Sequence, residues 1–296
     1  MAIVAAIALG ACGGDDDATP KEARTSEPAV RIGTKDFTEQ FILGELYSRA
    51  LRAKGFRVEL KRDVGSSEII HQALEGGALD MYPEYIGVLL SEIANRRERP
   101  DSPRAAHRAA KAFEERRGFT LLAMTPFSDS NALAVKRSFA RRHDLRTIAD
   151  LGEVPGRVEI GAAPEFRTRY EGLVGLTERY RLDNLQVKSL PIGKQYAALE
   201  EGDVDAAAVF TTAGQLRGRD YVLLEDPRGL FASQHVAPVI SRRTVRDHGR
   251  RLTATLDAVS ARLTTQAMRK MNAAVDEDRR SPGSVADAFL RDERLK

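Results

Sequence analysis

The sequence predicts an α/β protein built from two similar lobes. An octad occurs twice, as ALEGGALD at residues 73–80 and as ALEEGDVD at residues 198–205, and a helical run precedes each copy. In both copies an apolar pair ends a helix, glycine supplies the positive φ that stops it, and the chain enters a short strand after the aspartate. Because 296 residues with 42% hydrophobic content can fill two cores, we expect one lobe around each octad.

The individual elements follow from hydrophobic periodicity and from start and stop signals. The order at the beginning of the chain is β-α-β-α, which favours parallel strands whose carboxyl ends meet at one edge. Ser66 and Ser67 cap the second helix, so its N-terminal amides should face that edge. We predict strands at residues 29–34, 57–61, 119–124, 132–136, 158–162, 205–210, 221–224 and 236–240. We predict helices at 38–54, around residues 69–74, at 242–260, 264–277 and 284–291, and between the later strands.

Each octad leads into a strand that ends on an aromatic residue. The first copy runs on to Tyr85 and the second to Phe210. Strand ends that carry aromatic and hydroxyl groups are where open α/β sheets hold their ligands. We therefore expect ligand-binding groups at these strand ends.

The N-terminus indicates an exported, membrane-anchored protein. Residues 2–11 are apolar, a run of ten that is too short to span a bilayer, and the run ends in Leu9, Gly10, Ala11 and Cys12. Small residues before a cysteine fit a bacterial lipoprotein signal, so we predict a signal peptide at 1–12 that ends at a lipidated Cys12. Residues 13–29 are polar and rich in Gly and Pro, as in a flexible tether. A chance cysteine after a short apolar start is the alternative, and because a basic residue is lacking we expect the natural start upstream of Met1.

Composition and motifs exclude several classes of function. The 46 Lys and Arg are interspersed with 43 Asp and Glu, a net charge of +3 that does not indicate a nucleic-acid partner. Cys12 is the only cysteine, and the five histidines lie far apart without metal-ligand spacing. The sequence also lacks a P-loop, a GxSxG elbow and a GxGxxG loop. We therefore predict no metal, no cofactor and no enzymatic activity.

Several short segments together resemble a known family. They are residues 31–40 (RIGTKDFTEQ), 65–67 (GSS), 71–74 (HQAL) and 80–85 (DMYPEY), followed by 164–166, 209–212 and 237–239. In combination they are similar to the substrate-binding proteins of glycine betaine, carnitine and choline ABC transporters. The resemblance covers the chain from Val30 to its C-terminus.

The resemblance implies a two-lobed periplasmic-binding-protein fold, the Venus flytrap, type II-like with two crossings between the lobes. We expect the crossings near residues 127–131 and 229–235, which gives one lobe of 30–128 plus 234–296 and another of 129–233. A ligand between the lobes closes them, and ABC permease subunits with a separate ATPase recognise the closed form. The expected protein is an extracytoplasmic monomer, tethered to the bacterial cell membrane through its lipid.

The resemblance also implies the ligand-binding residues. Family members hold a quaternary ammonium among tyrosine rings by cation-π attraction and clamp a carboxylate with arginine. By position, Tyr85 and Phe210 supply two aromatic walls, Arg169 matches the clamp, and Lys35 and Gln40 match a polar floor.

The sequence departs from the family pattern at two further walls. Asn131 and Gln234 stand where the family has tyrosine, and Asp129 is the expected anionic partner for a cation. Losing half of the cage costs about 1 to 3 kcal/mol of trimethylammonium binding. We predict a small zwitterionic or cationic osmolyte such as glycine betaine, choline or carnitine. The alternatives are a more polar amine or amino-acid-like ligand, a ligand-sensing domain, and an enzyme on the same scaffold.

Overall fold

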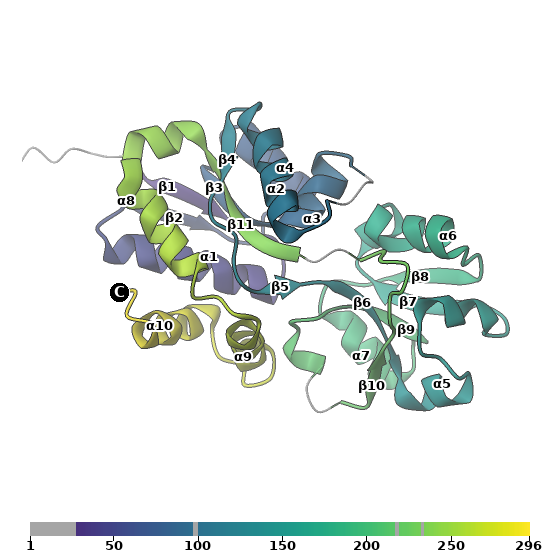
Figure 1. Ribbon diagram of the computed structural model, residues 1–296. Coiled ribbons are helices and arrows are strands. Elements are labelled where there is room, and N and C mark those ends of the chain that lie inside the picture. The colour runs from purple at the N-terminus through teal and green to yellow at the C-terminus, as the bar shows by residue number, and fades with distance from the viewer. Residues whose placement is uncertain (1–27, 97–99, 217–218, 232–233) are drawn as a thin grey trace, which may run out of the picture.

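Two β-sheets divide the chain, and helices cover each of them (Figure 1). The structure is a computed structural model that describes residues 28–96, 100–216, 219–231 and 234–296. The predicted signal peptide with Cys12, and the tether up to residue 27, lie outside the described residues. We call each sheet with the helices packed on it a lobe.

The sheet of the first lobe has the strand order β2-β1-β3-β11-β4, with β5 paired to β11. Strand β1 is parallel to β2 and β3, whereas β11 runs antiparallel to its neighbours. The strands are β1 (Val30–Gly33), β2 (Val58–Lys61), β3 (Met81–Tyr85), β4 (Phe119–Leu121), β5 (Ser128–Asp129) and β11 (Gln234–Ser241). The helices are α1 (Thr38–Ala53), α2 (Ser67–Glu75), α3 (Ile86–Val88), the π-helical turn η1 (Leu89–Ile93), α4 (Pro103–Glu115), α8 (Arg242–Ser260), α9 (Thr265–Asp276) and α10 (Pro282–Asp292).

The second lobe repeats this plan with the order β10-β6-β9-β7-β8. Strand β7 is parallel to β8 and β9, and β6 is antiparallel to β9. The strands are β6 (Asn131–Lys136), β7 (Val158–Ala162), β8 (Leu185–Ser189), β9 (Ala206–Phe210) and β10 (Tyr221–Leu223). The helical elements are α5 (Arg137–Arg142), η2 (Ile148–Glu153), η3 (Pro164–Arg167), η4 (Tyr170–Val174), α6 (Gly175–Tyr180), α7 (Lys194–Glu201) and η5 (Gly214–Leu216).

The two octads occupy equivalent places in the two lobes. Each one ends a helix, α2 or α7, and leads into the strand β3 or β9. Asp80 at the end of the first octad accepts a hydrogen bond from the backbone N–H of Arg31 on β1, at 2.8 Å. Asp205 accepts the same bond from the N–H of Glu159 on β7, at 2.9 Å. Each aspartate thus clips its strand to the neighbouring parallel strand, and the predicted internal repeat is confirmed.

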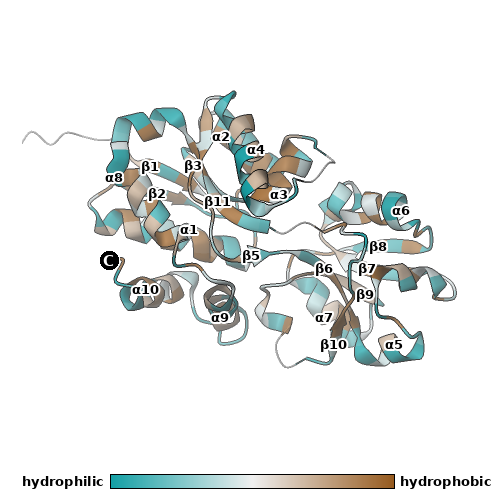
Figure 2. Cartoon of the chain, in the orientation of Figure 1, coloured by the Kyte–Doolittle hydropathy of each residue, from teal (hydrophilic) through white to brown (hydrophobic). Residues whose placement is uncertain are grey.

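Each lobe has its own hydrophobic core. Leu43 and Leu46 of α1 are fully buried beneath the first sheet, and Leu133 and Val158 are fully buried in the second. Figure 2 shows hydrophobic residues along the strands of the second sheet and hydrophilic ones along α5. The two cores are separate clusters, so the surfaces between the lobes are not part of either core. No helix among the described residues is long and apolar enough to cross a membrane.

The predicted elements are largely found, with two differences. The sequence did not predict β5 and β8; β5 has only two residues, and β8 is an edge strand that alternates apolar and polar residues. The sheets are also mixed where parallel strands were expected. Strands β6 and β11 enter each sheet from the other lobe, which allows them to run against their neighbours.

The chain passes between the lobes along adjacent paths. Strand β5 pairs with the first residues of β11, with Gln234 opposite Asp129. From β5 the chain continues directly into β6 of the second lobe, and β11 brings it back into the first sheet. Helix α9 also reaches the second lobe, since the Cα of Gly214 in η5 packs closely against Ala273.

Candidate functional site

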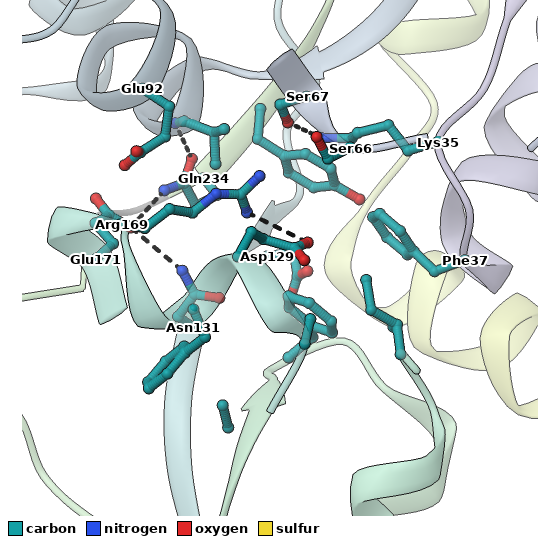
Figure 3. A pocket seen from close by; sticks show the side chains of 18 of the residues that line it. Lys35, Phe37, Ser66, Ser67, Glu92, Asp129, Asn131, Arg169, Glu171 and Gln234 are labelled. Atoms are coloured by element: carbon teal, nitrogen blue, oxygen red, sulfur yellow. Dashed lines mark hydrogen bonds and ion pairs between the residues drawn. The ribbon is translucent and has the colours of Figure 1, made fainter. Parts of the chain in front are cut away.

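A cavity of about 850 Å³, partly open to solvent, lies between the two lobes (Figure 3). All of the residues that the sequence assigned to ligand binding line it, except Gln40. The lining consists of Lys35, Asp36, Phe37, Ser66, Ser67, Tyr85, Val88, Glu92, Asp129, Asn131, Ala163, Glu165, Phe166, Arg169, Glu171, Ile192, Gln195, Ala208, Phe210 and Gln234.

Three aromatic rings stand at the cavity in a row. Tyr85 ends β3 and Phe210 ends β9, the equivalent positions after the two octads. Phe37 lies between them, with its ring centroid 6.1 Å from that of Tyr85 and 5.6 Å from that of Phe210, and with interplanar angles of 24° and 12°. The Tyr85 hydroxyl donates to Glu39 Oε1 at 2.7 Å, which fixes the tilt of that ring.

Sequence reasoning missed Phe37, although it quoted the segment that contains it. The signal was available, because Phe37 follows the first strand at the same sheet edge as Tyr85. Its backbone has extended φ and ψ at the N-cap of α1, which directs the side chain away from the helix. The cavity therefore has a third aromatic wall beyond the two that the sequence predicted.

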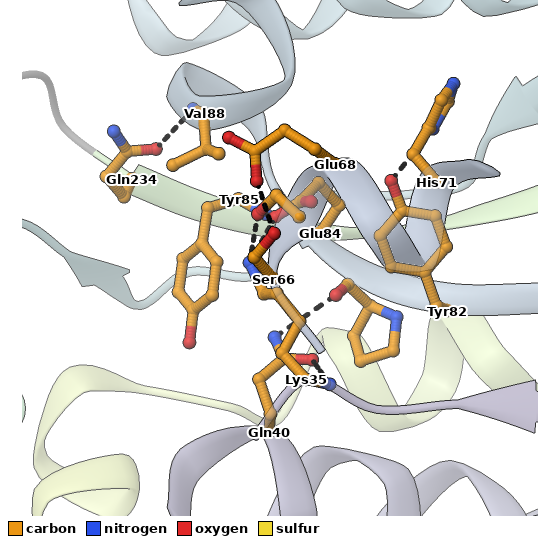
Figure 4. A network of polar contacts seen from close by, with 12 residues as sticks. Lys35, Gln40, Ser66, Glu68, His71, Tyr82, Glu84, Tyr85, Val88 and Gln234 are labelled. Carbon is orange, nitrogen blue, oxygen red and sulfur yellow. Dashed lines mark hydrogen bonds and ion pairs between the residues drawn. The ribbon is translucent and has the colours of Figure 1, made fainter. Parts of the chain in front are cut away.

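Lys35 is buried at the cavity wall, within a network of polar contacts (Figure 4). Its ammonium donates to Glu84 Oε1 at 2.6 Å and to Ser67 Oγ at 2.9 Å, and it lies 4.4 Å from the centroid of the Tyr85 ring. Burial lowers the pKa of Lys35, and the Glu84 carboxylate opposes that shift. The lysine is thus a fixed cation with its own counter-ion.

Gln40 lies behind the cavity wall, which corrects its predicted place in the polar floor. Its amide donates to the carbonyl of Pro83 at 3.1 Å and accepts from the backbone N–H of Lys35 at 3.4 Å. The side chain is fully buried, because the third residue of α1 points toward β3 and not toward the second lobe. Gln40 therefore joins the strand end to the Lys35 loop without reaching the ligand space.

Arg169 of the second lobe pairs with Glu68 of α2 in the first lobe. The guanidinium Nε and Nη2 donate to the two carboxylate oxygens of Glu68 at 3.2 and 3.0 Å, as a two-pronged fork. Burial opposes ionisation of Glu68, but the bonds from Arg169 outweigh it and hold the pKa of Glu68 at about 2. The predicted carboxylate clamp is thus occupied by a carboxylate of the protein itself.

Glu171 accepts hydrogen bonds from Asn131 and Gln234, the two residues that stand where the family pattern has tyrosine. The amide nitrogens of Asn131 and Gln234 both donate to Glu171 Oε2, at 3.3 and 2.9 Å (Figure 3). The Gln234 oxygen accepts from the backbone N–H of Val88 at 3.1 Å. Gly87 allows this approach, since a Cβ there would lie 2.5 Å from the Gln234 amide.

Asp129 stands between the lobes at the cavity wall. Its Oδ1 accepts from the backbone N–H of Thr212 at 3.1 Å and from the hydroxyl of Thr211 at 3.3 Å. Burial, and then the nearby carboxylate of Glu39, raise the pKa of Asp129 well above its usual value. A cation in the cavity would favour the ionised form of this group.

Four carboxylates of the lining were not predicted as site residues: Asp36, Glu92, Glu165 and Glu171. Glu171 and Glu92 both line the cavity, and the buried Oε1 of Glu92 has no hydrogen-bond partner in the structure. Burial raises the pKa of Glu92. Neither residue lies in a segment with a recognisable motif, because helical turns of different lobes bring them to the cavity. Aromatic faces surrounded by carboxylates are suited to binding an organic cation.

Within the described ranges, no group of three or more His, Cys, Asp or Glu residues is placed to hold a metal ion. The carboxylates at the cavity face aromatic rings and amides instead.

Comparison with known proteins shows the family and the fold. Residues 28–292 match the profile of the family described as the substrate binding domain of the ABC-type glycine betaine transport system. The chain is 31% identical over 277 residues to a glycine-betaine-binding protein of Pseudomonas aeruginosa, covering 90% of this chain and 88% of that one. It is 24% identical over 270 residues to the carnitine transport binding protein OpuCC of Listeria monocytogenes, covering 90% and 87%.

A solved structure has the same fold. It is the crystal structure of a glycine betaine/carnitine/choline ABC transporter protein, with a TM-score of 0.71 at 23% identity, covering 90% of this chain and 99% of that one. The family consists of solute-binding proteins of transporters and is not a class of enzymes. The chain therefore belongs to the family of substrate-binding domains of ABC-type glycine betaine transport systems, and it is the substrate-binding component of such a transporter.

Proposed function

We propose that the cavity between the lobes binds a small organic cation or zwitterion with a quaternary ammonium group. The observation that carries this proposal is the row of Tyr85, Phe37 and Phe210, which meets carboxylates from both lobes in one cavity. Each desolvated contact between a cation and an aromatic face contributes about 0.5 to 2 kcal/mol. The relatives named for glycine betaine and carnitine support the same ligand class.

The site residues then have distinct roles. The three rings and Asp129 receive the cation, while Lys35 and Gln40 hold the loop and strand that carry the rings. Asn131 and Gln234 position Glu171 at the cavity wall. Arg169 holds the second lobe against the first through Glu68.

The transport step follows from closure of the lobes. We assign residues 30–128 plus 234–296 to one lobe and 129–233 to the other. A ligand that contacts both lobes stabilises their closed arrangement, which the ABC permease recognises before the ligand is delivered. We propose that the protein acts as a monomer outside the cytoplasm.

We also propose that Cys12 carries the lipid anchor. The support is the small-residue pattern before this single cysteine and the polar stretch that follows it. Metabolic labelling with a fatty-acid analogue should mark the wild-type protein and not a Cys12→Ser variant. Labelling of both proteins, or of neither, would show that Cys12 is not the anchor.

Calorimetric titration of the purified full chain tests the ligand class. Choline, glycine betaine, carnitine and proline betaine are titrated into the wild type, Tyr85→Leu and Tyr85→Phe. We expect Tyr85→Leu to lose at least tenfold in affinity, because it removes the π-face, and Tyr85→Phe to lose about threefold or less. Equal losses in both variants would argue against a cation-π site.

A more polar amine is the second candidate ligand, because amides replace two aromatic walls. In the structure the amide nitrogens of Asn131 and Gln234 are already bonded to Glu171. Absence of heat with all four quaternary ammonium compounds would favour this candidate. Mass spectrometry of the small molecules that co-purify with the protein would then identify the ligand.

A further inference from the structure

The cavity has few positive charges, and each faces a carboxylate of the protein. Among the described residues that line it, Lys35 and Arg169 are the cations, against the carboxylates of Asp36, Glu92, Asp129, Glu165 and Glu171. The Lys35 ammonium donates hydrogen bonds to Glu84 and Ser67 and lies 4.4 Å from the centroid of the Tyr85 ring, so its charge already has a partner. Lys35 is therefore not free to bind a ligand carboxylate.

The guanidinium of Arg169 is surrounded in the same way. Nε and Nη2 form the fork with Glu68, and Nη1 lies 3.9 Å from Glu165 Oε1. A fork of two parallel N–H···O bonds is the geometry by which arginine binds a ligand carboxylate. Glu68 lies beside the cavity and not in its lining, and from the opposite lobe it takes up the two guanidinium N–H groups that would clamp a ligand carboxylate.

Glu68 is held in this position by its own lobe. The hydroxyl of Ser66, at the N-cap of α2, donates to Glu68 Oε2 at 2.6 Å (Figure 4). Ser66 has the N-cap position but no side-chain capping bond, so its hydroxyl serves Glu68 instead. The arrangement is therefore fixed at both ends, by Ser66 on one side and Arg169 on the other.

A ligand carboxylate entering this cavity would have to displace Glu68 or remain beside several carboxylates. Glu165 and Glu92 both act on Arg169 electrostatically, and Glu171 lies on the same wall. A like charge in a partly dehydrated site is strongly unfavourable. A cation without a carboxylate meets no such cost, and the surplus of acidic groups attracts it.

We propose that Glu68 is a specificity-determining residue, which occupies Arg169 and thereby selects organic cations without a carboxylate over zwitterions with the same head group. This proposal rests on the quaternary ammonium site proposed above. It predicts that the protein prefers choline to glycine betaine, two ligands that share the trimethylammonium group and differ in a hydroxymethyl against a carboxylate.

The test is calorimetric titration of the full chain with choline and with glycine betaine, in the wild type, Glu68→Gln and Glu165→Gln. We expect the wild type to bind choline at least tenfold more tightly. Glu68→Gln should improve glycine betaine binding by at least tenfold and change choline binding by less than threefold. Glu165→Gln removes a carboxylate 3.9 Å from Arg169 Nη1 without opening the fork, and it should improve glycine betaine binding by a clearly smaller factor than Glu68→Gln does.

The other outcomes overturn the proposal in distinguishable ways. A wild type that binds glycine betaine as tightly as choline would show that Glu68 does not select cations over zwitterions. Equal changes for both ligands in Glu68→Gln would show that the pair acts only as a contact between lobes. Absence of binding of both ligands to all three folded proteins, checked by circular dichroism, would instead refute the quaternary ammonium site itself.

Discussion

Phe37 and Phe210 stack on each other although they belong to different lobes. Their ring centroids are 5.6 Å apart and their planes differ by only 12°. Phe37 precedes α1 in the first lobe, and Phe210 ends β9 in the second. The two rings therefore form a contact between the lobes at the cavity where their π-faces are available to a ligand. Any movement that opens the cavity must separate the two rings.

Phe37→Leu should weaken binding of choline by at least tenfold, because it removes the central ring of the row while keeping an apolar side chain. Titration calorimetry measures the loss. Phe113→Leu is the control, since Phe113 is a partly buried residue of the first lobe outside the cavity. Wild-type affinity in Phe37→Leu would show that the ligand is held by the outer rings alone.

Asp129→Asn should stabilise the ligand-free protein and weaken cation binding. The folded state raises the pKa of Asp129, first through burial and then through Glu39, so it holds this proton to a higher pH than the unfolded chain does. Stability is therefore lost as the pH rises from about 4 through the raised value. The amide of Asp129→Asn does not ionise, so this loss does not occur in the variant. Its unfolding temperature should be about 2 to 4 °C above that of the wild type at pH 8 and nearly the same at pH 4.

Choline affinity should fall by about tenfold in the same variant, because a neutral amide replaces the anionic partner. Asp276→Asn provides the control. Burial also raises the pKa of Asp276, but this residue lies outside the lining of the main cavity. A loss of affinity in Asp276→Asn equal to that in Asp129→Asn would mean that general charge, and not the position of Asp129, attracts the ligand.

Gly87→Ala should destabilise the protein by about 1 to 3 kcal/mol, because the new methyl group would displace the Gln234 amide and leave the N–H of Val88 without its partner. Urea unfolding measures the change. Gln234 is buried and has little room to move.

A double-mutant cycle with Gln234→Ala isolates this clash. In the double variant, the methyl group introduced by Gly87→Ala no longer meets the amide, so its own cost should fall below about 0.5 kcal/mol. An undiminished cost of Gly87→Ala in the Gln234→Ala background would assign the effect to the helix backbone instead.

Glu114→Gln should stabilise the protein at alkaline pH. Glu114 is fully buried, its two carboxylate oxygens have no hydrogen-bond partner, and its Oε1 lies 3.8 Å from His71 Nε2. Burial raises the pKa of Glu114 to about 7, against the opposing charge of Arg117. Because the raised pKa belongs to the folded state, stability is lost as the pH rises from about 4.5 to 7.

We expect the glutamine variant to gain on the order of 2 kcal/mol at pH 8 in urea unfolding, and to show no gain at pH 4.5. Glu115→Gln is the control, because the adjacent side chain is 47% exposed and should leave the pH profile unchanged. A wild-type profile that stays flat from pH 4.5 to 8 would contradict the assignment of this titration to Glu114.

Local sequence signals were sufficient to predict most helices and strands and part of the site. The octads predicted the equivalence of β3 and β9, and with it the placement of Tyr85 and Phe210 at equivalent strand ends, both of which line the cavity. They succeed because a helix stop followed by a strand is encoded in a few consecutive residues. The family resemblance then supplied Lys35, Asp129, Asn131, Arg169 and Gln234, all of which line the cavity.

The place of Gln40 depended on the direction of its side chain. Gln40 lies in the expected helix, but its position on α1 points toward Pro83 and away from the ligand space. Sequence spacing gives the element and not the face that packs against its neighbours.

The sequence by itself determined the two-lobed α/β plan, the strand ends that carry the aromatic residues, and the signal for a lipid anchor at Cys12, because each depends on residues close together in the chain. Only the tertiary structure decided that Phe37 stacks between Tyr85 and Phe210, that Asn131 and Gln234 converge on Glu171, and that Glu68 occupies Arg169. Glu68 and Arg169 are separated by 101 residues and lie on different lobes. Their pairing depends on how two independently folded surfaces meet, and no local pattern in the chain encodes that geometry.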